Sequence, residues 1–499
     1  MKPEVIVIGS GMGSLAASAI LCSKGWKVTL LEQGKVAGGC SSSFEREGFI
    51  FESGATTLVG LDAGMPLDYV LKETGIKLNA RLLETPMRIF LKDGSELIRY
   101  RELDKWISEA ERVFGLPGQE SFWRECYQIS QFVWDTSLKQ ISFPPSNFSD
   151  LVDCALNATV VQLKNAGKAL ISTEKLLIKH GLHTNIKFRE FVDEQLIITA
   201  QNSANEVNAL FGATALCYTN FGNYYLDGGL ITMINKITDY LKINGSEIIY
   251  NSEVIKIDKG FNYFIQTAEK TYQTKNLISG IPINNLYDLL NKKSTKDQTA
   301  PYSTIQKGRS SAQKLEAKLL LSKKLSGAFT MGLVINGKPN NKEILHHQIV
   351  LSKPITGLNS KSIFISFSHP NDSVRTRDGK TIANVSTHVH DPEKNTFENK
   401  DQVMNDIIDL LINKGFFRKE QILYSHATTP KGWENWTKRK YGFVGGYPQF
   451  MKIKPWQMQN ARLEKGLYLV GDSVYPGQGI PGVTLSGIIA ANKLIADNK

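Results

Sequence analysis

The stretch that decides the fold is VIVIGSGMGSLAASAILCSKGWKVTLLE, from Val5 to Glu32. Four apolar β-forming residues, Val5 to Ile8, lead into a glycine-rich turn, and a helix of small residues follows from about Met12 to Ser23. A second apolar strand, Lys27 to Leu31, ends at an acidic residue. This succession of strand, glycine turn, helix and strand is typical of the first unit of a Rossmann-type nucleotide-binding domain.

The glycine turn carries the residue types that bind the phosphates of a dinucleotide. Gly9 permits the tight turn, Gly11 allows the backbone to approach a pyrophosphate, and the free N–H groups of the helix N-terminus attract the anion. Glu32 is placed to accept hydrogen bonds from the hydroxyls of an adenosine ribose. Ser14 replaces the third glycine of the G-x-G-x-x-G pattern but is small enough for close helix–strand packing. The pattern also occurs by chance, yet its position between two such strands predicts dinucleotide binding.

A second glycine-rich segment, GGCSSSFEREGFIFESGA, runs from Gly38 to Ala55. Gly38 and Gly39 would let the backbone wrap closely around a ligand, and the serines supply hydroxyl donors. An ordinary β-hairpin with a glycine turn and no ligand would have a similar sequence. Directly after a Rossmann unit, the segment favours FAD over NAD, because FAD is long and must pass between this loop and the nucleotide-binding strand.

The C-terminal segment GLYLVGDSVYPGQGIPGVTLSGIIAAN, from Gly466 to Asn492, predicts the flavin end of the same site. A strand, Leu467 to Val470, ends at Gly471 and Asp472, and a helix of small residues begins near Val483. Asp472 is placed to bind a ribityl hydroxyl, and the helix N-terminus would stabilise negative charge on a reduced flavin.

The predicted fold class is therefore α/β, with a Rossmann-type FAD-binding domain assembled from both chain ends and an inserted substrate domain of mixed sheet and helical cap. We assign residues 1–85, 220–290 and 441–499 to the FAD-binding domain, in which backbone groups around Val254 are expected to contact the adenosine. Residues 86–219 and 291–440 form the predicted substrate domain, which is also the part expected to contact a membrane.

Length and composition fit a protein of two to three domains, with 499 residues of which 41% are hydrophobic and 21% charged. No run of 18 apolar residues predicts a membrane-spanning helix, and the early first strand argues against a signal peptide. The five cysteines are dispersed without a C-x-x-C pair or a histidine at metal-ligand spacing. This usage predicts a reducing, cytoplasmic location without disulfides or metal.

The net charge of +11 comes from 59 basic and 48 acidic residues, and no nucleic-acid-binding motif accompanies it. Two explanations stay open, attraction to an anionic membrane surface and an ordinary lysine-rich solvated surface. The stretch from Leu156 to His180 interleaves apolar residues with lysines, which predicts a basic amphipathic helix. Such a helix either lies on a membrane or packs on the core with a solvated lysine face.

The region between the two ends predicts strands from Leu315 to Leu321, Phe329 to Ile335, Ile363 to Ser368 and Thr381 to Thr387. Four histidines in this region suggest a metal site, but carboxylate and thiol partners at suitable spacing are missing from the sequence around them. The four are His346, His347, His388 and His390. We therefore predict no metal site.

Four motifs together carry a resemblance to a known family: VIVIGSGMGSLAA (Val5 to Ala17), GGCSSSFEREGFIFESGA (Gly38 to Ala55), YYLDGGL (Tyr224 to Leu230) and GLYLVGDSVYPGQGIPGVTLSG (Gly466 to Gly487). The chain resembles, over essentially its whole length, the carotenoid desaturase and isomerase family of FAD-dependent oxidoreductases. That family includes phytoene desaturases, carotene cis–trans isomerases and retinol saturases. Ser14 and Glu52, which stands where an aspartate is common, depart from the family pattern.

The resemblance implies a two-electron reaction at FAD with a long apolar polyene taken from a membrane by a peripherally associated protein, most simply carotenoid desaturation. Carotene cis–trans isomerisation and a retinol-saturase-like reaction would use the same site. A flavin amine oxidase and a flavin-containing carotenoid carrier are further alternatives. The sequence shows no acid–base dyad, so no catalytic residue is predicted, and it makes no prediction of oligomeric state.

The candidate cofactor-binding residues drawn from these segments are Gly9, Gly11, Met12, Gly13, Ser14, Glu32, Gly38, Gly39, Cys40, Val254, Gly471, Asp472, Ile480, Pro481, Gly482 and Val483.

Overall fold

In a computed structural model, which describes residues 3–54, 56–292, 311–339, 343–375, 377–395 and 397–499, the first and last strands of the chain share one sheet. Its order is β10-β2-β1-β14-β21-β20, and every neighbouring pair except β20–β21 is parallel. The strands are β1 (Glu4–Ile8), β2 (Lys27–Leu31), β10 (Glu247–Ile249), β14 (Leu277–Ser279), β20 (Arg462–Glu464) and β21 (Leu467–Leu469). The Rossmann-type α/β fold assembled from both chain ends is thus confirmed.

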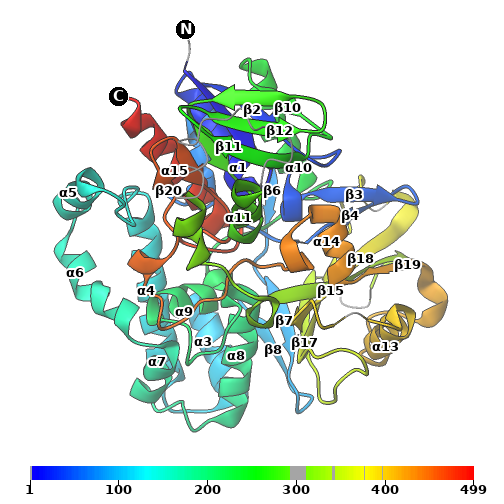
Figure 1. The fold of residues 1–499 in the computed structure, drawn as a ribbon. Helices are drawn as coiled ribbons and strands as arrows, with labels where there is room; N and C mark the ends of the chain where they lie inside the picture. The colour runs from blue at the N-terminus through cyan, green and yellow to red at the C-terminus, as the bar shows by residue number, and fades with distance from the viewer. Residues whose placement is uncertain (1–2, 55, 293–310, 340–342, 376, 396) are drawn as a thin grey trace.

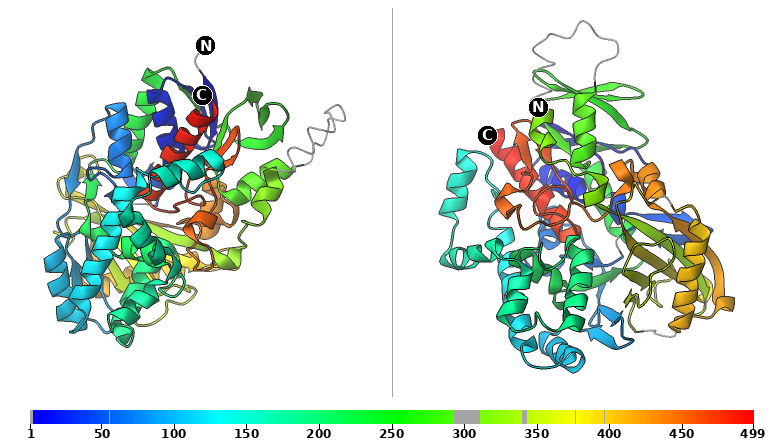
Figure 2. Two further views of the ribbon diagram at one scale, coloured as in Figure 1. Left: turned by 90° about the vertical axis from the view of Figure 1, so that its left-hand side faces the viewer. Right: turned by 60° about the horizontal axis from the view of Figure 1, so that its bottom comes forward.

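Helix α1 (Met12–Ser23) packs directly on the C-terminal helix α15 (Ile480–Asp497), and the two ends of the chain lie close together in Figures 1 and 2. A Cβ atom added at Gly487 would lie only 2.4 Å from the carbonyl oxygen of Gly13 and 3.0 Å from Cβ of Ala16. The small residues of α1 are therefore required by a close crossing of two helices. Helix α10 (Ile231–Ile243) and helix α2 (Pro66–Thr74) also contact α1 or α15.

Three small sheets flank this core. One contains β11 (Val254–Lys259), β12 (Tyr263–Thr267) and β13 (Thr271–Thr274). Another pairs β3 (Ser43–Arg46) with β4 (Phe49–Glu52), and the third joins β5 (Leu58–Val59), β9 (Asn223–Leu226) and β6 (Ala80–Leu82). The third sheet joins the early chain to the YYLDGGL motif.

A seven-stranded mixed sheet forms a second layer, in the order β19-β15-β18-β17-β16-β7-β8 (Figure 1). Its neighbours are antiparallel except for β16 and β7. Helix α13 (Lys400–Asn413) packs against it through buried Ile407 and Leu411. The strands are β7 (Met87–Phe90), β8 (Glu96–Arg99), β15 (Ser326–Asn336), β16 (His346–Val350), β17 (Ser362–Phe367), β18 (Lys380–His390) and β19 (Ile422–Thr428).

The predicted strand from Leu315 to Leu321 is wrong, because residues 311–316 are helical. Ala312 and Leu315 are buried while Gln313, Lys314 and Glu316 are exposed, which is the spacing of one apolar helix face rather than of a strand. The other three predicted strands correspond to β15, β17 and β18.

A group of helices covers the other side of the seven-stranded sheet (Figure 1). Its core contains interlocking aromatic rings, among them Trp106, Trp123 and Phe191. The helices are α3 (Leu103–Phe114), α4 (Gln119–Ser137), α5 (Phe148–Leu156), α6 (Val160–Ala166), α7 (Thr173–Lys179), α8 (Ile186–Ala200) and α9 (Ala209–Leu216).

The single basic amphipathic helix predicted from Leu156 to His180 is wrong. This stretch contains the end of α5, then α6 and α7, separated by residues 157–159 and by a short 3₁₀ turn. Thr159 begins α6 with a capping box, which stops α5 from continuing. Lys168 and Lys179 do not form a free lysine face, since both pair with Glu125 of α4. No helix among the described residues is long and apolar enough to cross a membrane.

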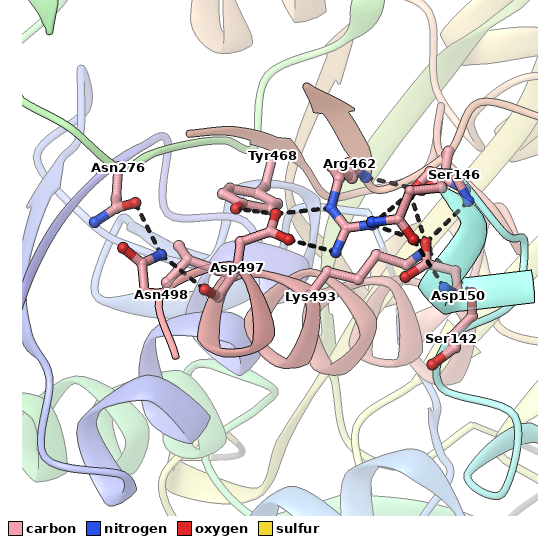
Figure 3. A network of polar contacts seen from close by, with 12 residues as sticks. Ser142, Ser146, Asp150, Asn276, Arg462, Tyr468, Lys493, Asp497 and Asn498 are labelled. Atoms are coloured by element: carbon pink, nitrogen blue, oxygen red, sulfur yellow. Dashed lines mark hydrogen bonds and ion pairs between the residues drawn. The ribbon is translucent and has the colours of Figure 1, made fainter. Parts of the chain in front are cut away.

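A buried ion network ties α5 to the C-terminal end of the chain (Figure 3). Asp150 accepts hydrogen bonds from Arg462 Nη1 at 2.9 Å and from Lys493 Nζ at 2.7 Å. Arg462 also binds both carboxylate oxygens of Asp497 at 2.8 Å, and Tyr468 Oη donates to Asp497 at 2.6 Å. The peripheral helix α5 is thereby joined to the core helix α15.

Candidate cofactor site

A cavity of about 340 Å³ lies where the parallel strands β1, β2, β14 and β21 end. The turns that follow these strands supply much of its wall, as expected for a ligand site in a Rossmann-type sheet. Its lining includes the predicted residues Gly9, Gly11, Met12, Gly13, Ser14, Glu32, Gly38, Gly39, Cys40, Val254, Gly471, Asp472 and Val483. The segments chosen from the sequence therefore meet around one cavity.

Three predicted residues lie outside this lining. Ile480 and Pro481 are buried in the first turn of α15, and the Pro481 ring packs against Gly60. Gly482 packs against Gly477, since a Cβ atom added at Gly482 would lie 2.8 Å from the Gly477 carbonyl oxygen. A direct contact of these three with a cofactor stays a prediction.

Glu32 holds the first two loops of the cavity together. Its Oε2 accepts a hydrogen bond from the Ser10 backbone N–H at 2.9 Å, and its Oε1 accepts one from the Gly34 backbone N–H at 2.6 Å. The carboxylate is thus fixed at the end of β2, facing the glycine turn after β1. In Rossmann-type domains, an acidic residue at this position accepts hydrogen bonds from the ribose hydroxyls of the dinucleotide.

The two glycine-rich segments meet backbone to backbone. Gly11 forms a bridge with Gly38, and a Cβ atom at Gly39 would lie 3.4 Å from the Gly11 Cα. At Gly9 the φ angle is +80°, which requires glycine, while a Cβ atom at Gly11 would meet no protein atom within 4 Å. The turn therefore presents bare backbone to the cavity, as a bound pyrophosphate requires.

Ser14 fits in place of the third glycine because Gly280 faces it. A Cβ atom at Gly280 would lie 1.8 Å from Ser14 Oγ, so the missing side chain at Gly280 leaves the room that the serine occupies. Ser14 is fully buried, and no protein group among the described residues accepts or donates a hydrogen bond at its Oγ. The close approach of α1 to the end of β14 is therefore possible with a serine at position 14 because position 280 is a glycine.

Asp472, at the predicted flavin end of the cavity, is paired with Arg439. Arg439 Nη2 contacts its two carboxylate oxygens at 3.1 and 2.9 Å, and the Arg439 guanidinium lies 4.2 Å from the ring centroid of Phe443. Arg439 also lines the cavity beside Cys40, a thiol whose pKa is raised by burial. Sequence reasoning missed Arg439, because it precedes the Y-G-F-V-G-G segment without any glycine or strand signal of its own.

Glu52, the second departure from the family pattern, is a buried connector. It accepts hydrogen bonds from Ser43 Oγ at 2.7 Å and from the Leu230 backbone N–H at 3.1 Å, next to the start of α10. Arg375 Nη1 lies 3.4 Å from the same carboxylate. Burial raises the pKa of Glu52, and the Arg375 charge opposes that shift. The longer side chain therefore joins β4, the YYLDGGL turn and Arg375 behind the cofactor loop.

Of the four histidines considered for a metal site, His346 and His347 are buried, His388 is half-buried and His390 is exposed. Burial lowers the pKa of His346 to about 4, of His347 to about 3 and of His388 to about 4. His346 hydrogen-bonds Thr57 and Ser366 across the sheet. Within the described ranges, no group of three or more His, Cys, Asp or Glu side chains is placed to hold a metal ion.

The donor set of the cavity fits FAD. Bare glycine backbone at Gly9 and Gly11 suits a pyrophosphate, the fixed Glu32 carboxylate suits a ribose, and the paired Asp472 suits a polyol. When bound, FAD supplies two-electron chemistry, and these residues would hold and orient it.

Comparison with known proteins agrees with this geometry. The family model of the flavin-containing amine oxidoreductases matches residues 15–495. The chain belongs to that family. A chloroplastic prolycopene isomerase of Daucus carota is 27% identical, over 99% of this chain and 80% of its own length. A carotenoid 3,4-desaturase of Haloarcula japonica is 23% identical, over 99% of this chain and 98% of its own.

The solved structure of an oxidoreductase from Methanosarcina mazei has the same fold, with a TM-score of 0.58 and 17% identity over 98% of this chain and 100% of that one. The resemblance to the carotenoid desaturases and isomerases is therefore confirmed. This family member is an FAD-dependent oxidoreductase of the carotenoid desaturase and isomerase type.

Proposed function

We propose that the protein acts on the double-bond system of a long, carotenoid-like polyene, and that its reaction is desaturation. The observation that carries the proposal is the similarity to enzymes named for carotenoids over 99% of the chain, substrate region included. Desaturation removes a hydride from one carbon and a proton from its neighbour. Bound FAD would supply the two-electron acceptor for the hydride, the proton would pass to water, and a quinone would reoxidise the flavin, so that electrons and protons balance.

We further propose that the predicted residues around the cavity hold FAD. Both carboxylates expected at the cofactor are engaged in the fold, Glu32 by backbone N–H groups and Asp472 by Arg439. Groups fixed in this way are suited to binding and orientation rather than to proton transfer. The hydride chemistry is then a property of the cofactor, and the protein contributes position and exclusion of water.

Cis–trans isomerisation is a second candidate, favoured by the match to the Daucus carota prolycopene isomerase. Isomerisation leaves the substrate with the same number of hydrogens, so it consumes no oxidant. The two candidates therefore differ in redox balance and not in the site they require.

The test is product analysis with FAD-loaded protein, a quinone as oxidant, and phytoene, lycopene, prolycopene or a hydroxylated carotene in detergent. Desaturation predicts a red-shifted product with two fewer hydrogens and one quinone reduced per new double bond. Isomerisation predicts a product of unchanged mass without quinone reduction. Conversion of none of these polyenes would contradict the proposal, and peroxide release with a polyamine would favour an amine oxidase.

We also propose that the protein docks on an anionic membrane surface through α5 and α6. Phe148 and Leu156 are each 79% exposed and Val160 is 68% exposed, which is unusual for large apolar side chains, and the net charge is +11. The fraction of protein that co-sediments with vesicles of mixed phosphatidylglycerol and phosphatidylcholine should fall severalfold in the Phe148→Ser, Leu156→Ser double variant. Equal sedimentation of the variant and the wild type would contradict this surface.

A further inference from the structure

We propose that the protein recognises a hydroxyl group on its substrate through the buried amide of Gln201 and the half-buried amide of Gln478, beside the cofactor cavity. The inference deepens the proposed function and rests on it. Gln201 ends α8 in the left-handed conformation, with φ +57° and ψ +23°, which a residue other than glycine rarely adopts.

Each of the two amides leaves one polar atom without a partner among the described residues. Gln201 is only 7% exposed, and its Nε2 lies 2.9 Å from Nε2 of His388 on β18. Gln478 Nε2 donates to the Ile198 carbonyl oxygen at 3.3 Å. The Oε1 atoms of both glutamines find no protein donor in the described part of the chain. Exchanging the amide ends of Gln201 would leave its nitrogen unpaired instead, so one atom stays available in either orientation.

The two amides converge on one point beside Gly445. A Cβ atom added there would lie 2.4 Å from Gln201 Nε2 and 2.9 Å from Gln478 Oε1. The next residue, Gly446, lies against Asp472, where an added Cβ would be 2.5 Å from the carbonyl oxygen. Asp472 lines the cofactor cavity. The amide pair is therefore separated from the cofactor wall by a single residue of the G-G segment.

The chemistry of this pair selects a neutral group that both donates and accepts hydrogen bonds. A hydroxyl can donate to Gln478 Oε1 and can pair with either end of the Gln201 amide, whereas a hydrocarbon can do neither. His388 is neutral at physiological pH because burial lowers its pKa to about 4, so it adds no charge. The nearby cation Arg439 is paired with Asp472, which disfavours a carboxylate or phosphate ligand.

The experiment compares lycopene with 1-hydroxylycopene, two polyenes that differ in a terminal hydrated group. Dissociation constants are measured by protein fluorescence quenching of the oxidised holoenzyme. Because a buried polar group left unpaired discriminates strongly against the apolar analogue, we expect wild type to bind the hydroxylated polyene at least about tenfold more tightly. Gln478→Met and Gln201→Met should each reduce this ratio toward one, while Gln402→Met, an exposed control on α13, should leave it unchanged.

Equal binding of the two polyenes by wild type, or a ratio preserved in both variants, would overturn the inference. So would loss of FAD from both variants with wild-type circular dichroism, because the amides would then be cofactor ligands. If neither polyene binds or is converted, the proposed function itself fails, and that outcome is distinct from equal binding. Retained FAD absorbance and unchanged lycopene affinity with a lost preference for the hydroxyl would support the inference.

Discussion

Ser14 and Gly280 show how a motif can be preserved by a residue that the motif does not contain. The serine occupies space that a side chain at Gly280 would otherwise fill, although the two residues are far apart in the sequence. The spacing within the glycine turn could be predicted from local sequence, because strand, turn and helix succeed one another directly. The matching glycine could not, since only the pairing of β1 with β14 brings it to α1.

Gly280→Ala is expected to destabilise the protein by about 1–3 kcal/mol, because the new methyl group would overlap Ser14 Oγ. Adding Ser14→Gly to this variant should recover most of the loss, whereas Ser14→Gly alone should change stability by less than about 1 kcal/mol. Urea unfolding of the wild type, the two single variants and the double variant measures the coupling. Additive effects of the two substitutions would contradict the exchange of space.

Arg439 gives a second prediction at the scale of one residue. Arg439→Met removes the cation that holds Asp472, and we expect the dissociation constant of FAD to rise about tenfold or more because a largely buried carboxylate loses its partner. Arg439→Lys should raise the dissociation constant of FAD less, and Arg418→Met, at an exposed site, should leave it unchanged. Titration of apoprotein with FAD measures the constants. An unchanged constant in Arg439→Met would exclude Arg439 from the site.

At the scale of elements, local patterns identified isolated strands well and helix boundaries in the cap poorly. Strands β15, β17 and β18 were predictable, because β-branched and aromatic residues run between clear turn signals. The stretch from Leu156 to His180 was not, because its lysines look like a solvated face until Glu125 of α4 is seen to bind two of them. The spacing of the lysines suggested a solvated face, but the contact with α4 shows that two of them are paired.

The Glu125 cluster predicts a pH dependence of the cap. Burial opposes ionisation of Glu125, but hydrogen bonds from Lys168, Lys179 and His180 bring its pKa down to about 2. Since the folded pKa lies below the ordinary value, the stabilisation is present above about pH 4.5 and is lost as pH falls toward 2. Glu125→Gln should therefore cost about 1 kcal/mol at pH 7, after allowance for solvent screening, and less at pH 3.

Thermal unfolding of Glu125→Gln at pH 7 and at pH 3 tests this dependence. Glu120→Gln is a matched control on the same helix, because Glu120 is exposed and pairs only on the surface with Arg124. A difference from wild type that stays constant between the two pH values would contradict the assignment.

At the scale of the whole molecule, the fold was predictable and the ties between its parts were not. Glycine turns at both ends of the chain indicated that β1 and β21 belong to one sheet. The attachment of α5 through Asp150, Arg462 and Lys493 could not be predicted from a sequence pattern, because Asp150 lies 312 positions before Arg462 and 343 before Lys493.

Asp150→Asn is expected to destabilise the protein by about 3 kcal/mol, because Arg462 and Lys493 would lose the shared carboxylate while they stay buried. Limited proteolysis should then cut first near α5, and the unfolding temperature should fall. Asp153→Asn, an exposed neighbour on the same helix, is the control. Equal stability of the two variants would show that the network does not hold α5.

The sheet order has a consequence for the biosynthesis of the protein. Strand β14 lies between β1 and β21, and the cofactor cavity is lined by residues from the start of the chain, by residues 252–289 and 436–439, and by Gly471, Asp472 and Val483 near its end. Until the C-terminal segment has been made, β14 has no partner for the edge that later pairs with β21, and α1 has none for the surface that later meets α15. The nascent chain therefore emerges without a place for FAD. We therefore expect the flavin to join the complete site only after translation has passed the C-terminal helix, which contributes Val483 to the cavity.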